Sequence, residues 1–160
     1  MTASHQTDIA LSRRTHERVG ERRADEAWLT ATWAEPGTRV LPLGGSRFPL
    51  AAGAATAGWR SPADAPEGTR VFLGMQDEVA HFAVLLPEEA AEEDWTPLRG
   101  AVQTMDPHDA GLVVHAVAMA EWHRNHRFCA RCGSPLRSTQ AGHLLTCAAH
   151  GHQHFPRTCE

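Results

Sequence analysis

Two metal-knuckle motifs near the C-terminus constrain the fold of this 160-residue chain more than any other feature. Cys129 and Cys132 are separated by two residues and followed by a glycine, and Cys147 and His150 repeat that arrangement after a gap of fourteen residues. Two intervening residues let one tight turn aim both ligands at a single ion, and glycine permits the positive φ that such a turn favours. Three thiolates and one imidazole form a tetrahedral set for zinc with no open position. The pattern therefore predicts a structural zinc ion in a ribbon built on a short β-hairpin.

The fourth zinc ligand is less constrained by the sequence than the three cysteines. His150 has the spacing of a second knuckle, so we predict it as the ligand. His152, His154 and Cys159 follow closely enough to replace it. His143 lies within the expected hairpin, and we expect it at the surface.

The expected location of the protein favours metal binding over disulfides for its clustered cysteines. The net charge is −4, which gives no overall attraction to nucleic acid or to an anionic membrane. No apolar run in the sequence approaches the roughly 18–20 residues of a membrane span. The first residues are polar and lack the charged-then-apolar order of a signal peptide. We therefore expect a cytoplasmic protein with reduced thiols, in which clustered cysteines bind metal.

The segment before the motifs predicts a small antiparallel sheet. Residues 1–24 are polar and charge-mixed and are expected to form an arm. Four runs rich in β-forming residues follow, separated by turns or by the Ala/Gly/Pro-rich stretch 51–68, and they occupy residues 28–33, 38–43, 70–75 and 79–86. A tight turn is expected at Gln76 and Asp77, between the last two strands.

A single buried helix is predicted between the sheet and the ribbon. Asp106 is suited to cap its first turn, and Pro107 is tolerated at the first helical position. The helix should continue to Trp122 or His123 and is apolar on nearly every face, which indicates burial on several sides. His115 is expected to be part of that packing. The expected fold class is therefore α+β: a small antiparallel sheet with one buried helix, followed by the zinc-ribbon hairpin.

Several short runs taken together resemble a known family. They are Val71 to Gly74, Ala80 to Ala83, Asp109 to Leu112, Trp122-His123, Phe128 to Gly133, Cys147, and His154 to Thr158. These runs resemble the N-terminal domain and zinc ribbon of the NADH pyrophosphatases, or NAD(+) diphosphatases, of the Nudix hydrolase superfamily. The resemblance covers about residues 25–158. It implies a domain at 25–123 and a zinc ribbon at 124–158, with many relatives carrying cysteine where this chain has His150.

The resemblance also implies a reaction and a partner. Such enzymes hydrolyse the pyrophosphate of NAD(H) to nicotinamide mononucleotide and AMP, and some remove NAD caps from RNA. A C-terminal Nudix domain does this with Mg or Mn held by glutamates of the Nudix box. Family members form homodimers, so the resemblance implies a homodimer here.

The sequence of 160 residues contains no Nudix box. Its one dense acidic cluster, Glu88 to Asp94, lacks the spacing and the arginine of that box. We therefore expect a non-catalytic front half, truncated before the Nudix domain and inactive alone, which a separate Nudix chain could complete. No catalytic residue of the family can be assigned.

The alternative is a stand-alone zinc-ribbon module that binds a protein or a nucleic acid. Nucleic acid is favoured only by the arginines around the first knuckle, which are Arg124, Arg127, Arg131 and Arg137, and the net charge of −4 opposes it.

Overall fold

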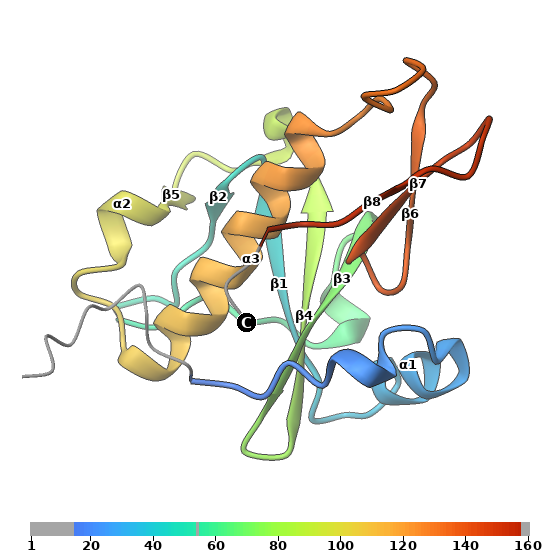
Figure 1. The fold of residues 1–160 in the computed structure, drawn as a ribbon. Coiled ribbons are helices and arrows are strands. Elements are labelled where there is room, and N and C mark those ends of the chain that lie inside the picture. The colour runs from blue at the N-terminus through green and yellow to red at the C-terminus, as the bar shows by residue number, and fades with distance from the viewer. Residues whose placement is uncertain (1–14, 54, 158–160) are drawn as a thin grey trace, which may run out of the picture.

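The computed structural model describes residues 15–53 and 55–157 and shows a mixed sheet between two helices, with a small ribbon beside it (Figure 1). Helix α3 (Pro107–Asn125) covers one face of the sheet, and α1 (Glu26–Trp33) covers the other. This arrangement confirms the α+β class. Along the parts of the chain just given, no helix combines the length and the apolar character needed to cross a membrane.

The main sheet has the strand order β3-β4-β1-β2-β5. Its strands are β1 (Arg39–Gly44), β2 (Arg47–Phe48), β3 (Thr69–Gln76), β4 (Val79–Leu86) and β5 (Thr96–Pro97). All pairs are antiparallel except β1 with β4, which run parallel. Because both faces are covered, β1 is buried at five consecutive positions, which explains its continuous apolar run.

Three of the four expected strands are confirmed as β1, β3 and β4, whereas the short strands β2 and β5 were not predicted. The turn after β3 differs by one residue from the expected one. Asp77 and Glu78 occupy it with φ angles of 50° and 63°. Positive φ at both central residues is the conformation that suits the twist of a two-residue hairpin.

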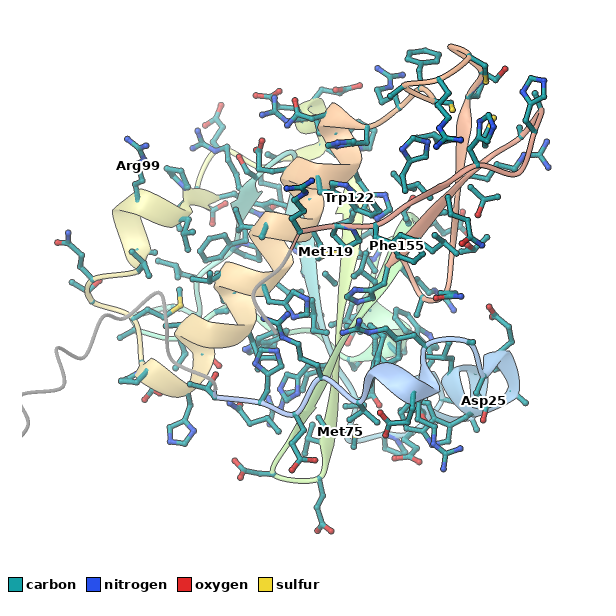
Figure 2. All side chains as sticks on the ribbon, in the orientation of Figure 1. Asp25, Met75, Arg99, Met119, Trp122 and Phe155 are labelled. Carbon is teal, nitrogen blue, oxygen red and sulfur yellow. The ribbon has the colours of Figure 1, made fainter. Side chains whose placement is uncertain are left out.

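The prediction of a strand at residues 28–33 is wrong, because this segment is helix α1. The Asp25 side chain accepts a hydrogen bond from the backbone N–H of Trp28 at 3.0 Å and so caps the helix (Figure 2). Trp28 then packs edge-on against Phe72, and Trp33 packs edge-on against Phe82. The tryptophans that suggested a strand are thus the contacts of a helix with the sheet, and packing overrides their β preference.

Helix α3 begins where the capping signal placed it. The Asp106 carboxylate accepts the backbone N–H of His108 at 2.8 Å, and Pro107 is the first helical residue. Between α3 and the sheet lies the larger core, and Met119 is one of its fully buried members (Figure 2). A one-turn helix, α2 (Leu98–Ala101), precedes α3 and was not predicted. Among the described residues, 3₁₀ turns at Gly20–Arg22, Pro62–Asp64 and Glu88–Ala90 complete the helical segments.

The zinc-ribbon segment forms a second, three-stranded antiparallel sheet of β6 (Leu136–Thr139), β7 (Leu144–Cys147) and β8 (Gln153–His154). The predicted hairpin is β6–β7, and its turn rests on the edge strand β3. The N–H of Phe72 donates to the carbonyl of Ala141 at 3.0 Å, and His143 Nε2 donates to the carbonyl of Phe72 at 2.7 Å. His143 is only 5% exposed, so its expected place at the surface is wrong. The turn that carries it docks on the sheet instead of facing solvent.

A second segment covers the same edge of β3. Glu17 and Met75 exchange two backbone hydrogen bonds of 2.8 Å, and the Gln76 side-chain amide donates to the carbonyl of Thr15 at 2.8 Å. Gly74, with a φ of 139°, permits this approach because a Cβ there would clash with the Glu17 carbonyl. Part of the expected polar arm is therefore docked, and its residues 1–14 lie outside the described parts.

Candidate metal centre

The two knuckles have the same backbone geometry. In the first, the N–H of Gly133 donates to the carbonyl of Cys129 at 2.8 Å, and in the second the N–H of Gly151 donates to that of Cys147 at 2.9 Å. Both glycines have positive φ, 70° and 69°. Each turn therefore closes on its first cysteine, as the glycine after each motif predicted.

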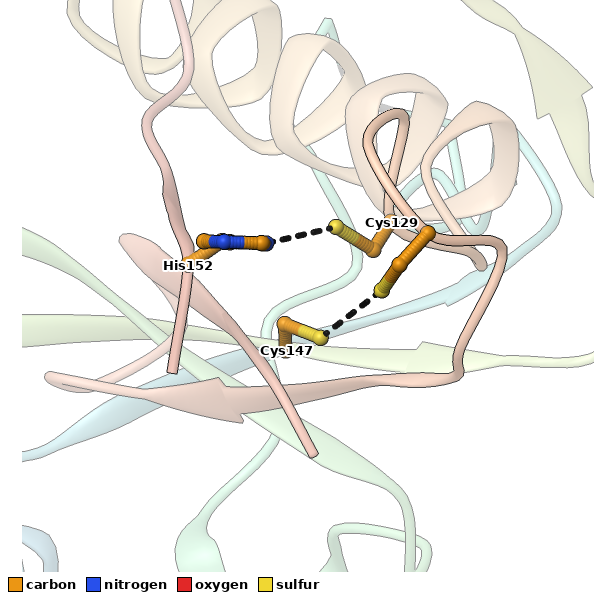
Figure 3. A group of neighbouring side chains, drawn as sticks. Cys129, Cys147 and His152 are labelled. Atoms are coloured by element: carbon orange, nitrogen blue, oxygen red, sulfur yellow. Dashed lines mark hydrogen bonds between the residues drawn. The ribbon is translucent and has the colours of Figure 1, made fainter. Parts of the chain in front are cut away.

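The knuckles bring four potential ligand atoms together. The thiols of Cys129, Cys132 and Cys147 and one ring nitrogen of His152 all lie within 4.8 Å of one another. Cys132 Sγ is 3.5 Å from Cys147 Sγ, and Cys129 Sγ is 3.5 Å from His152 Nδ1 (Figure 3). A zinc–sulfur bond of about 2.3 Å in a tetrahedron places neighbouring ligand atoms roughly 3.5–3.8 Å apart. The donor set and its spacing fit one structural zinc ion.

The histidine in this group is His152, whereas the spacing of the second knuckle pointed to His150. In the repeated knuckle His150 corresponds to Cys132, and its imidazole is close enough to the Cys132 thiol to lower the pKa of that thiol. The two imidazole rings lie side by side, 5.6 Å apart and 23° from parallel. His154 is outside the group, and Cys159 lies outside the described residues. The sequence had offered His152 as an alternative fourth ligand, because it lies only two residues after His150.

The electrostatics of the thiols differ. Hydrogen bonds from the hydroxyl and the backbone N–H of Ser134, and then from His150, lower the pKa of Cys132 to about 5. This cysteine is therefore a thiolate at neutral pH, which is the form that binds metal. Burial raises the pKa of Cys129, so this thiol releases its proton only when a metal takes its place.

Other histidines and carboxylates that the sequence contains make contacts that hold the fold. His81, in β4, is buried, and its Nδ1 is 3.0 Å from the carbonyl of Val79. The acidic cluster from Glu88 to Asp94 lies around a 3₁₀ turn, and within it Glu92 pairs with Arg60 at 3.5 Å. Across residues 15–53 and 55–157, the cysteine–histidine group is the only set of three or more His, Cys, Asp or Glu side chains close enough to share an ion.

Asp109 has a role that the sequence did not reveal. Besides lying in the first turn of α3, its carboxylate accepts the backbone N–H of Ala57 at 2.7 Å and the indole N–H of Trp59 at 3.0 Å. It therefore ties the long loop after β2 to the start of α3. Only an alignment of related chains could have signalled this pairing, because the partners are about fifty residues apart.

The fold and the knuckles together define a sheet domain with an attached zinc ribbon of the NADH pyrophosphatase type. Residues 23–122 match the NADH pyrophosphatase-like rudimentary NUDIX domain, and residues 124–155 match the NADH pyrophosphatase zinc ribbon domain. The chain therefore belongs to the NADH pyrophosphatase family.

Curated relatives agree with this assignment. The chain is 31% identical to the NAD-capped RNA hydrolase NudC of Mycobacterium tuberculosis, over 92% of this chain and 49% of the relative. It is 34% identical to the protein of the same name in Stutzerimonas stutzeri, over 57% of this chain and 30% of the relative. It is 33% identical to human mitochondrial NAD(P)H pyrophosphatase NUDT13, over 53% of this chain and 25% of the relative. The chain thus spans half or less of the relatives it matches.

Proposed function

We propose that these 160 residues are the non-catalytic N-terminal and zinc-ribbon part of an NAD(H) diphosphatase-type Nudix hydrolase. The family reaction converts NAD(H) to nicotinamide mononucleotide and AMP, and the curated relatives named NAD-capped RNA hydrolase extend the substrate to NAD-capped RNA. In this proposal residues 25–123 form the N-terminal domain and 124–158 the ribbon, after an arm at 1–24. The observation that carries the proposal is the closed four-donor group, within a ribbon docked on the sheet.

The metal has a structural task in this proposal. When bound, zinc supplies a cross-link between the two knuckles and offers no open position to a substrate. A hairpin of this size buries too little apolar surface to fold without such a link. The ribbon in turn keeps its β6–β7 turn on the edge of β3.

We assign Cys129, Cys132, Cys147 and His152 as the zinc ligands, with His150 as the hydrogen-bond partner of the Cys132 thiolate. The short distance from His152 Nδ1 to Cys129 Sγ supports His152. The repeat of the knuckle supports the competing assignment of His150. Zinc competition with a chromophoric chelator separates the two, using His150→Ala and His152→Ala side by side. Loss of more than about 100-fold in affinity is expected for His152→Ala, and of about 10- to 100-fold or less for His150→Ala, because an outer partner of a ligand contributes about that much; the reverse order would make His150 the ligand.

Activity is proposed to require a Nudix domain, supplied either on a longer polypeptide or by a separate chain that supplies the glutamates for Mg or Mn. We further propose a homodimer in the cytoplasm, on the family relationship alone. Sedimentation equilibrium of the zinc-loaded protein tests the dimer, and a purely monomeric protein at tens of micromolar would contradict it.

The decisive assay is NAD(H) hydrolysis by the purified 160-residue protein with Mg or Mn, with zinc counted on the same sample. The Mycobacterium tuberculosis relative serves as the positive control. We expect about one zinc per chain and no turnover. Metal-dependent turnover that copurifies with the chain would overturn the proposal and direct attention to the carboxylates from Glu88 to Asp94.

A further inference from the structure

Three histidines from distant parts of the sequence meet where the docked N-terminal segment, helix α3 and the ribbon turn converge. His16 Nε2 lies 3.2 Å from His115 Nδ1, and their rings stack at 5.4 Å. The ring of His143 lies 5.6 Å from that of His115. His115 is 4% exposed and His143 is 5% exposed, so the cluster is shielded from solvent.

The surroundings of this cluster are cationic. Burial first, and then the charges of nearby groups, lower the pKa of His115 to about 2 and that of His143 to about 4. Arg18 and Arg23 act on both histidines, together with His16 on His115 and His123 on His143. Within the part of the chain that the structure describes, no carboxylate is among the main influences on either imidazole. The charge of Arg18 therefore acts on two imidazoles that are kept neutral.

Three buried polar atoms of these residues have no hydrogen-bond partner among residues 15–53 and 55–157: Arg18 Nη1, His115 Nε2 and His143 Nδ1. Leaving a buried donor or acceptor unpaired costs about 1–3 kcal/mol, and more when the group is charged. Native proteins leave few such atoms, and a bound water or ion is a common explanation. Arg18 lies against Gly74 and His143 against Phe72 on the same edge of β3, and the His115 ring is 5.6 Å from that of His143, so we infer one shared partner.

The tautomer of His143 determines which ring atom an anion would contact. Its Nε2 contacts the carbonyl of Phe72, and because a carbonyl only accepts, Nε2 carries the hydrogen. Nδ1 is then the atom that gains a proton when the ring becomes charged. An anion beside Nδ1 would favour this proton, and it would also accept from the Arg18 guanidinium. A metal cation is disfavoured by the charge of Arg18, and among the described residues these histidines do not form a group with metal-ligand spacing.

We propose that Arg18, His115 and His143 bind a phosphate group. A tetrahedral oxyanion offers acceptors in several directions, which suits donors that arrive from three separate segments, and arginine matches phosphate in geometry as well as charge. Binding draws a proton onto His143 Nδ1, so the affinity for an oxyanion of fixed charge, such as sulfate, rises as the pH falls from 8 to 6. The bound anion also joins the N-terminal segment to α3 and to the ribbon turn.

The test uses the zinc-loaded 160-residue protein in a phosphate-free buffer. The thermal midpoint is followed against inorganic phosphate, sulfate or AMP, each at an ionic strength matched with NaCl. We expect the midpoint to rise with phosphate and sulfate and to stay constant with NaCl alone. A rise with AMP of equal size assigns the site to a nucleotide phosphate, and a rise with the inorganic anions alone assigns it to free phosphate. No rise with any of the oxyanions would overturn the proposal.

Two variants locate the site. Arg18→Gln should weaken sulfate binding by about tenfold or more, because a charge-assisted contact is lost. Arg22→Gln is the matched control: this neighbouring guanidinium already pairs with Asp25 at 3.2 Å, and its removal should leave sulfate binding unchanged. Equal weakening in both variants would show general charge screening and overturn the assignment.

A measurement on the unaltered protein keeps the proposal testable if Arg18→Gln fails to fold. Nitrogen chemical shifts of the histidine rings report protonation at each atom, and sulfate keeps its charge between pH 6 and 8. We expect sulfate to shift His143 Nδ1 toward its protonated value, more strongly at pH 6 than at pH 8. Unchanged His143 shifts at saturating sulfate would contradict the proposal.

Discussion

Acid should destabilise this protein through its buried histidines, and His143 allows the effect to be measured. Its pKa is lowered from 6.5 to about 4 in the folded state, with burial as the main cause. Between these two values the unfolded chain binds more protons than the folded one, so stability is fully present above pH 6.5 and is lost as the pH falls toward 4. At pH 5 the loss from this one group is about 2 kcal/mol. That is a large part of the roughly 5–15 kcal/mol of a typical domain.

His143→Gln isolates this contribution. The glutamine amide can still donate to the carbonyl of Phe72, but it cannot be protonated. Urea unfolding in phosphate-free buffer at pH 7 and pH 5 gives the free energy of unfolding of each protein. We expect the loss between the two pH values to be about 2 kcal/mol smaller in His143→Gln than in the unaltered chain. Zinc loss in acid affects both proteins and cancels in this difference.

An exposed histidine provides the control for this comparison. His108→Gln, at the start of α3, replaces an exposed ring and is the matched histidine-to-glutamine substitution. If His143→Gln and His108→Gln lose stability equally between pH 7 and pH 5, the claim that the buried ring is held neutral is refuted.

Three further outcomes follow from the contacts described. Gly142→Ala should lower the free energy of unfolding by about 2–4 kcal/mol, because φ is +88° and the added Cβ would lie 2.6 Å from Val71 Cγ2. Gly53→Ala is the control, since φ is +66° but the space around it is open, and it should cost less. Equal costs for the two variants in urea unfolding would argue against docking of the β6–β7 turn. Asp109→Ala removes two hydrogen bonds and should cost about 2–4 kcal/mol in the same assay, so a cost under about 1 kcal/mol would contradict its role as a tie. Cys132→Ser should lose zinc and leave residues 125–155 open to proteolysis, and unchanged zinc content with full protection would exclude this cysteine as a ligand.

The features that the sequence predicted well are the ones with local causes. Asp106 and Pro107 mark the start of α3 because a cap and a first-turn proline act within a few residues. Cys129 and Cys132 predict a knuckle because their spacing determines the turn. In each case the physical cause lies within a short stretch of chain. The family resemblance gave these predictions further support.

The errors arose where distant contacts decide the structure. Trp28 and Trp33 have side chains that suit a strand, yet their packing against the phenylalanines of the sheet requires a helix. The parallel pairing of β1 with β4 joins strands some forty residues apart, and alternation of residues does not reveal direction. His143 looked like a surface residue because nothing nearby in sequence indicates that the ribbon turn reaches the carbonyl of Phe72. The choice between His150 and His152 is of the same kind, since spacing and three-dimensional distance favour different rings.

Two segments cover the exposed edge of β3, the β6–β7 turn and the chain around Glu17, and this cover connects zinc binding to the solubility of the protein. An edge strand exposes unpaired N–H and C=O groups that can recruit the edge of another molecule. Here the Ala141 turn occupies one such position and Glu17 another, so neither is available to a neighbouring chain. The hold of the ribbon on that turn depends on its zinc. In metal-poor conditions the Phe72 end of β3 would lose its cover, and the first symptom would be intermolecular strand pairing and aggregation, before any change in the core beneath α3.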